Sequence, residues 1–176
     1  MRAAKKQEAG GGSFVDGMTA TQVRERSHLM TAELVGRLRT AAPRSVSFRF
    51  RMPAPLRAIP MKQQLLSGAT ERWTVGYLLD TILTRDAWMH RVDIARAIDR
   101  DVILTAAHDG RIVADAVAEW ARRHGQSFTL ELTGAGGGTF VAGSGGETIS
   151  LDAVDLCRIF SGRDTGEGLL AQEVPF

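Results

Sequence analysis

The sequence predicts an α+β protein, with helices in its first half and a small antiparallel sheet between two helices in its second half. Three observations lead to this fold class. After Gly76 a long run without glycine or proline carries apolar residues at helical spacing. Between residues 128 and 151 apolar residues alternate and are interrupted by glycine-rich turns. Amphipathic helix patterns flank that region at residues 109–124 and 152–160.

The first elements are predicted from turn and capping residues. Residues 1–17 have the composition of a flexible polar tail, and a short helix is expected from residue 19 to 27. A clearer helix begins at Thr31, the expected N-cap, and should end at Pro43. Its apolar face would consist of Leu34, Val35, Leu38 and Ala42. Four of the five prolines lie in residues 43–69, which predicts a long irregular connection.

A long helix is predicted from residue 74 to 99. At about 100° per residue, one stripe of this helix starts aliphatic and then turns polar. The stripe consists of Leu79, Ile82, Leu83, Asp86, His90, Asp93 and Ala97. We expect this stripe to face the core. Its charged part then needs a partner or a metal, because buried charge is otherwise expensive.

The pair Asp86 and His90 is the candidate metal site of this helix. Side chains at i and i+4 project from one face, which is the geometry of helical metal sites. Asp93, one turn beyond, could accept a hydrogen bond from the imidazole and fix its tautomer. The alternative is an Asp–His hydrogen bond inside a helical core without metal. Zinc usually takes three or four protein ligands, and this helix offers two.

The second half is expected to form a separate domain, residues 102–176, after a first domain at residues 18–101. The helix at residues 109–124 should bury Ile112, Val113, Ala116, Val117 and Trp120 and stop at Gly125. Three strands with two glycine-rich hairpin turns should form an antiparallel meander. A last helix should be capped by Asp152 and stopped by Gly162. Neither glycine run is followed by Lys-Ser/Thr, so phosphate-binding loops are not predicted.

Composition limits the class of protein. The net charge is +2, and no apolar run reaches the length of about 18 residues that a membrane helix needs. One cysteine, Cys157, excludes an internal disulfide, fits a cytoplasmic protein and should be a small buried apolar residue. Between Glu33 and Glu71 there are basic residues and no acid, which favours a solvated basic face over an anion-binding one. No nucleic-acid-binding motif is present.

Three segments resemble one family: Tyr77-Leu-Leu-Asp80, Thr84-Arg-Asp-Ala-Trp-Met-His-Arg-Val-Asp-Ile-Ala-Arg-Ala97, and Leu151-Asp-Ala-Val-Asp-Leu-Cys-Arg-Ile-Phe-Ser-Gly-Arg163. Together with the order of the two halves, they are similar to the mycothiol-dependent maleylpyruvate isomerase family of DinB-like metalloenzymes, over nearly all of residues 18–176. The resemblance implies a DinB-like helical bundle that binds a divalent metal, commonly zinc. It also implies a sterol-carrier-like α/β second domain.

The resemblance assigns ligands by position. Asp86 takes the place of the family's acid, usually glutamate, and His90 takes the place of its later histidine. The family's early histidine lies upstream of this segment, so we expect this shortened chain to lack it; His28 matches no ligand position. Arg85 and Arg91 point off the stripe and are assigned to the surface or to a substrate carboxylate.

Two functions are therefore expected. The first is a metal-dependent, mycothiol-type thiol-utilising isomerase or transferase, inactive if the first ligand helix is absent. The second is a non-catalytic small-molecule-binding or scaffold module with a structural Asp86–His90–Asp93 network. In either case an incomplete bundle should cover its open apolar face, which predicts a homodimer.

Overall fold

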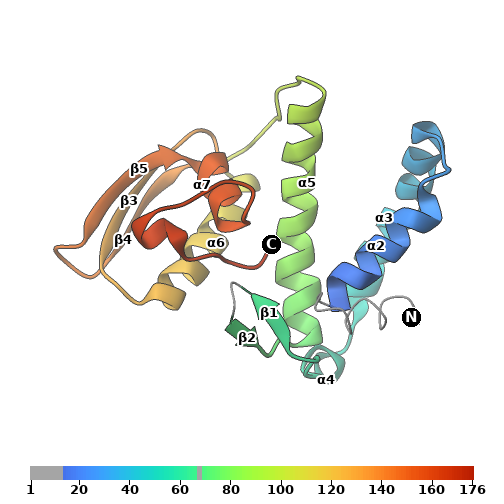
Figure 1. Ribbon diagram of the computed structural model, residues 1–176, viewed down its shortest axis with the longest axis horizontal. Helices are drawn as coiled ribbons and strands as arrows, with labels where there is room; N and C mark the ends of the chain where they lie inside the picture. Colours follow the sequence, from blue (N-terminus) through green and yellow to red (C-terminus); the bar gives the residue numbers. More distant parts are fainter. Residues whose placement is uncertain (1–13, 67–68) are drawn as a thin grey trace. The chain divides into compact units, whose positions relative to one another are not determined.

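The computed structural model describes residues 14–66 and 69–176, so residues 1–13 of the predicted flexible tail lie outside the described part. The chain mixes helices with small sheets, as the α+β prediction requires (Figure 1). It divides into two compact units, Met1–Asp80 and Thr81–Phe176.

The first unit is mainly helical. Its described elements are α2 (Phe14–Arg26), α3 (Thr31–Arg51), α4 (Ala54–Arg57), and the antiparallel pair β1 (Gln64–Leu66) and β2 (Ala69–Glu71). Met30, rather than Thr31, occupies the N-cap of α3, and its backbone N–H donates to the Glu33 carboxylate at 3.2 Å. The predicted helix start is therefore displaced by one residue.

The predicted end of this helix at Pro43 is wrong. Proline lies inside α3, which continues for eight further residues to Arg51. An interior proline removes one helical hydrogen bond and costs about 3 kcal/mol. Here the carbonyl of Arg39 loses that bond, and the exposed position of this turn lets water take its place. Half of the expected irregular connection is consequently helix.

The predicted long helix is present, but its first turns are not regular. A π-helix, Tyr77–Ile82, leads into α5, Leu83–Ala97. A π-helical turn holds an extra residue and shifts the angular positions of the residues before it relative to those after it. For this reason the aliphatic residues before Leu83 and the polar residues after it do not form the single stripe that a regular helix would give.

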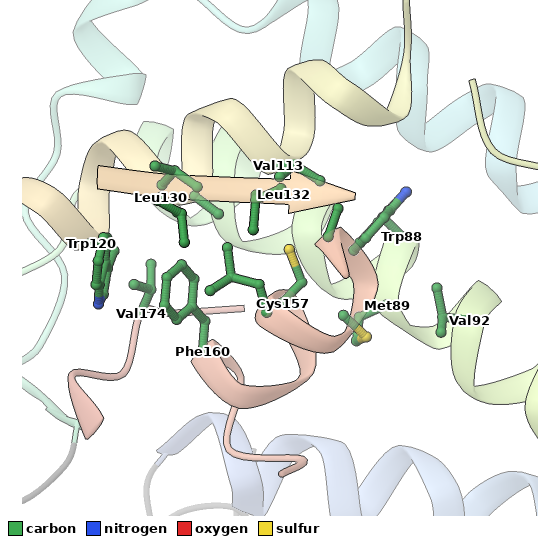
Figure 2. Packing of buried hydrophobic residues seen from close by; sticks show 14 of the residues in the cluster. Trp88, Met89, Val92, Val113, Trp120, Leu130, Leu132, Cys157, Phe160 and Val174 are labelled. Atoms are coloured by element: carbon green, nitrogen blue, oxygen red, sulfur yellow. The ribbon is translucent and has the colours of Figure 1, made fainter. Parts of the chain in front are cut away.

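The core of the second unit lies between helices and one face of a sheet. Its further elements are α6 (Asp109–His124), β3 (Phe128–Thr133), β4 (Gly138–Ala142), β5 (Glu147–Asp152), α7 (Ala153–Phe160) and a 3-10 helix at Gly168–Ala171. Trp88, Met89 and Val92 of α5 are buried with side chains of α6, α7 and β3 (Figure 2). Thus α5 packs with the second half of the chain, whereas we expected it to belong to a first domain ending at residue 101.

Helices α6 and α7 of this unit confirm their predictions. Gly125 follows α6 in the left-handed conformation at φ 65°, and the predicted apolar face of α6 lies in the core. The Asp152 carboxylate caps α7 by accepting the backbone N–H of Val154 at 2.7 Å. Gly162 follows α7 at φ 69°. Cys157 is fully buried, as expected for a small apolar side chain.

The sheet is mixed, so the predicted antiparallel meander is wrong in its last strand. The strand order is β4-β3-β5, with β4 antiparallel and β5 parallel to the central strand. Ala142 and Glu147 both align with Phe128, from opposite sides. The first glycine run is a hairpin as expected, but the second, residues 143–146, crosses the start of β3.

Small residues make this crossing possible. A Cβ on Gly146 would lie 1.9 Å from the Ser127 carbonyl oxygen, and one on Gly143 would lie 2.1 Å from the Ser127 hydroxyl oxygen. The glycines are therefore required by the close passage of two backbones.

Replacing Gly146 with alanine is expected to lower the free energy of unfolding by about 2 kcal/mol or more, because a backbone atom must move. Gly145→Ala is the control: no atom lies within 4 Å of its Cβ, and only its φ of 70° opposes the substitution, at about 1 kcal/mol. Urea unfolding of both variants measures the difference. If both variants lost the same free energy of unfolding, the close passage of the loop past Ser127 would not be the reason for Gly146.

None of the helices within residues 14–66 and 69–176 has both the length and the hydropathy needed to cross a bilayer.

Candidate functional site

Asp86 and His90 lie next to each other on α5. The Nε2 atom of His90 is 3.3 Å from an Asp86 carboxylate oxygen. The side chains are 60% and 38% exposed, respectively. The buried face of α5 instead carries Arg85, Trp88, Met89 and Val92. Our expectation that the polar stripe faces the core is therefore wrong, and burial does not require these two groups to have a partner.

The spacing of the pair suits a shared metal ion. Zinc binds imidazole nitrogen and carboxylate oxygen at about 2.0–2.1 Å, which separates two ligand atoms of a tetrahedral site by about 3.3 Å. The nitrogen–oxygen distance in this structure has that value. The pair therefore needs little rearrangement to bind one ion through both atoms.

Asp93 has a different partner from the one expected. Its carboxylate accepts a hydrogen bond from Nε of Arg163 at 2.8 Å and lies 3.7 Å from the guanidinium of Arg158. The distance to Nδ1 of His90 is also 3.7 Å, too long for a hydrogen bond. In this structure Asp93 therefore ties α5 to α7 and the segment after it, and it does not orient the imidazole.

The number of candidate ligands remains two. Across residues 14–66 and 69–176 no group of three or more histidine, cysteine or acidic side chains is arranged to hold a metal. His28 lies in the turn between α2 and α3, in the first unit. The structure thus brings two of the predicted ligand side chains, Asp86 and His90, next to each other.

Arg85 forms the most extensive polar network of the second unit. Only 1% exposed, it donates to the carboxylates of Asp115 and Glu119, both at 2.7 Å, and to the carbonyl of Pro175 at 3.0 Å. Its guanidinium also lies over the Phe176 ring. Glu119 is held further by Arg123 at 2.7 Å. The expectation that Arg85 lies at the surface or binds a substrate carboxylate is wrong, because Arg85 is buried and its guanidinium pairs with two carboxylates of the same chain.

Asp109 is a second buried charge with a full set of donors. Its carboxylate accepts hydrogen bonds from Nε1 of Trp88 at 2.8 Å, from the backbone N–H and hydroxyl of Thr105, and from Arg91. Burial by itself raises the pKa of this carboxyl, but the donors outweigh it and hold the pKa well below its ordinary value. Arg91, like Arg85, therefore has a structural partner in this unit.

Cys157 does not belong to a reactive site. Burial raises the pKa of its thiol to about 12, although the nearby Arg85 opposes that change. A thiol with such a pKa is protonated near neutral pH and is a poor nucleophile or metal ligand.

We compared the chain with protein-family models, with curated proteins and with solved structures, and none of the three comparisons finds a match. The site must therefore be interpreted from its own chemistry.

Proposed function

We propose that this chain is a DinB-like, metal-dependent protein of the thiol-utilising isomerase or transferase kind, in which Asp86 and His90 supply two ligands of a divalent metal. Zinc is the proposed metal because it accepts imidazole and carboxylate together in tetrahedral sites. The observation that carries the proposal is the 3.3 Å separation of the two ligand atoms on one solvent-accessible helix face.

The two side chains would have distinct tasks. Nε2 of His90 would donate its lone pair to the metal, and the Asp86 carboxylate would contribute charge as well as a ligand oxygen. Bound there, the metal would supply Lewis-acid chemistry and lower the pKa of a coordinated thiol, such as that of a mycothiol-type cosubstrate, or of water. The remaining ligand would come from elsewhere in the chain or from a second copy.

A second candidate is a non-catalytic small-molecule-binding or dimeric scaffold module. Asp93 supports it, because its contacts with Arg163 and Arg158 bind α5 to the α7 region without any need for metal. In this function Asp86 and His90 are no more than two neighbouring polar side chains on the surface of α5. Such pairs stabilise a fold by about 1 kcal/mol or less.

Metal content of the purified protein, measured after exposure to zinc and gel filtration, tests the proposal. We expect about one zinc per chain in the wild type, and loss of that zinc in both His90→Ala and Asp86→Ala. His28→Ala is the matched control and should keep the metal. The variants should also lose less than about 1 kcal/mol of stability, since both side chains are exposed.

If the wild type binds no zinc, or if His90→Ala binds as much zinc as the wild type, the metal-dependent function is contradicted. The second candidate would then be preferred. Because the substitutions leave the fold nearly unchanged, thermal unfolding of each variant separates loss of the ligand from loss of structure.

A further inference from the structure

Helix α3 of the first unit has an apolar face that the described structure leaves open. The helix spans 21 residues and contains no buried side chain. Leu38 is 65% exposed and Phe48 is 61% exposed, and Leu34, Val35 and Val46 are exposed as well. Large apolar side chains that face solvent along most of a helix indicate an interaction surface.

Most of the large apolar side chains of α3 fit a heptad repeat. From Leu34 onward, positions spaced alternately by four and three residues form the a/d pattern of a coiled-coil seam, with Ser45 as its polar member. Val35, Val46 and Phe50 are exposed apolar residues outside this pattern. The d positions are Leu34, Ala41 and Phe48, and the a positions are Leu38, Ser45 and Met52. Pro43 falls at an f position, and it also lines the groove that Phe48 and Met52 line. The seam therefore fits one further helix lying along α3.

A row of arginines flanks the seam. Arg37, Arg44 and Arg51 are seven residues apart and occupy the three g positions. All three are exposed, and the described residues form no ion pair with them. No aspartate or glutamate occurs between Glu33 and Glu71. From Leu34 to its end at Arg51, α3 therefore carries charge of one sign.

The seam and the arginine row meet in a groove beside α4. The groove has a volume of about 570 Å³ and is apolar at Phe48, Met52 and Leu56, with Arg44 and Arg51 on its wall. A groove with an apolar floor and a basic wall suits an amphipathic helix. The apolar side chains of such a helix would contact the floor, and carboxylates beside them would face the arginines.

A second copy of α3 is a poor occupant on charge grounds. An antiparallel pair would place g against g, so that arginines face arginines. A parallel pair would place g against e of the next heptad, where Arg44 would meet Arg49 and Arg37 would meet Ala42. Neither arrangement gives the arginine row an acidic partner.

We propose that α3, together with α4, docks an acidic amphipathic helix of another polypeptide. The partner would carry apolar residues at its a and d positions and aspartate or glutamate at its e and g positions. Its carboxylates would pair with Arg37, Arg44 and Arg51, and these pairs would set its orientation on the seam.

The probe for this proposal is a synthetic three-heptad peptide with leucine at a and d and glutamate at e and g. A matched peptide carries lysine at e and g. Fluorescence anisotropy of each labelled peptide with the full chain should show saturable binding of the glutamate peptide. Binding of the lysine peptide should be weaker by about tenfold or more. Raised salt should weaken the glutamate complex.

Variants of the chain make the test specific. Arg37→Glu, Arg44→Glu and Arg51→Glu together should reverse the preference between the two peptides, and Leu38→Glu should abolish binding of both. The control combines Arg96→Glu, Arg100→Glu and Arg111→Glu, which changes the net charge equally at exposed positions of the second unit. It should retain the preference for the glutamate peptide.

Three results would overturn the proposal. One is equal binding of the two peptides, or binding of neither. Another is a dimer of the chain without peptide that Leu38→Glu dissociates, which would assign the seam to a second copy. The last is tighter binding to phosphatidylserine vesicles than to the glutamate peptide, lost in Leu38→Glu, which would assign it to an anionic lipid surface.

Discussion

Replacing Arg85 with methionine is expected to lower the free energy of unfolding of the second unit by about 3 kcal/mol or more. Methionine can fill much of the volume of the arginine side chain. The buried carboxylate of Glu119 keeps its hydrogen bond from Arg123 but loses the one from Arg85. The substitution also leaves the Pro175 carbonyl without the donor that Arg85 supplies. Removing one partner of a buried ion pair is expensive because the other charge stays buried.

Thermal and urea unfolding of the full chain measure this loss. The midpoint of the thermal transition of the second unit should fall by about 12 °C or more. Arg96→Met, on an exposed part of the same helix, is the matched control and should change stability by less than about 0.5 kcal/mol. Adding Glu119→Met to Arg85→Met should restore part of the loss, because the buried carboxylate that lost the Arg85 donor is then removed as well. If Arg85→Met were as stable as Arg96→Met, the network would not hold the unit together.

Replacing Asp109 with asparagine is expected to cost about 2–3 kcal/mol at neutral pH. Asparagine has nearly the same shape as aspartate, but it lacks the negative charge to which Arg91 and Thr105 donate hydrogen bonds. Its N–H₂ group must also face some of these donors, where it cannot accept a hydrogen bond. Hydrogen bonds to a buried charged group contribute about 1.5–3 kcal/mol.

The same carboxylate predicts how stability depends on pH. In the folded protein its pKa lies well below the ordinary value of 3.8. Below about pH 4 the unfolded chain therefore binds a proton that the folded chain does not, so stability falls as the pH decreases. Above that pH the contribution is fully present.

Urea unfolding of wild type and Asp109→Asn between about pH 2.5 and pH 7 tests both statements. The wild type should lose stability in the acid range more steeply than the variant, and the two curves should converge as the pH falls. Parallel curves would show that Asp109 does not supply the acid sensitivity. Asp155→Asn, at an exposed helix position, serves as the control for a general carboxylate effect.

The parts of the fold that the sequence predicted best are two helices that each carry at least one residue marking an end. The helix from Asp109 to His124 has an apolar face and a glycine stop, and the last helix has a capping aspartate and a glycine stop. Both lie where they were expected. Such local signals determine a helix largely without information from the rest of the chain.

Elements that depend on tertiary context were predicted less well. The direction of β5 follows from a crossing past Ser127, and alternation of apolar residues cannot distinguish this from a hairpin. Pro43 was taken as a helix stop, but the surrounding residues continue the helix through it. The π-helical turn before Leu83 carries no simple sequence signal, and it displaced the predicted stripe.

The candidate site shows the same division. Residues four apart on a helix must be neighbours, so the contact between Asp86 and His90 was predictable. The contacts of Arg85 and Asp93 reach residues far along the chain, at Asp115, Glu119, Pro175 and Arg163, and spacing alone could not reveal them. The available clue was that Arg85 lies three and four residues before Trp88 and Met89, on the strongly apolar face of the same helix.

The most direct test of the proposed metal site is a zinc titration of the full chain followed by the proton NMR signals of its four histidines. We predict that the imidazole signal of His90, assigned with His90→Ala, changes and saturates near one equivalent of zinc. Those of His28, His108 and His124 should stay in place. A titration in which His90 does not respond, or in which all four histidines respond alike, would contradict the assignment of Asp86 and His90 as metal ligands.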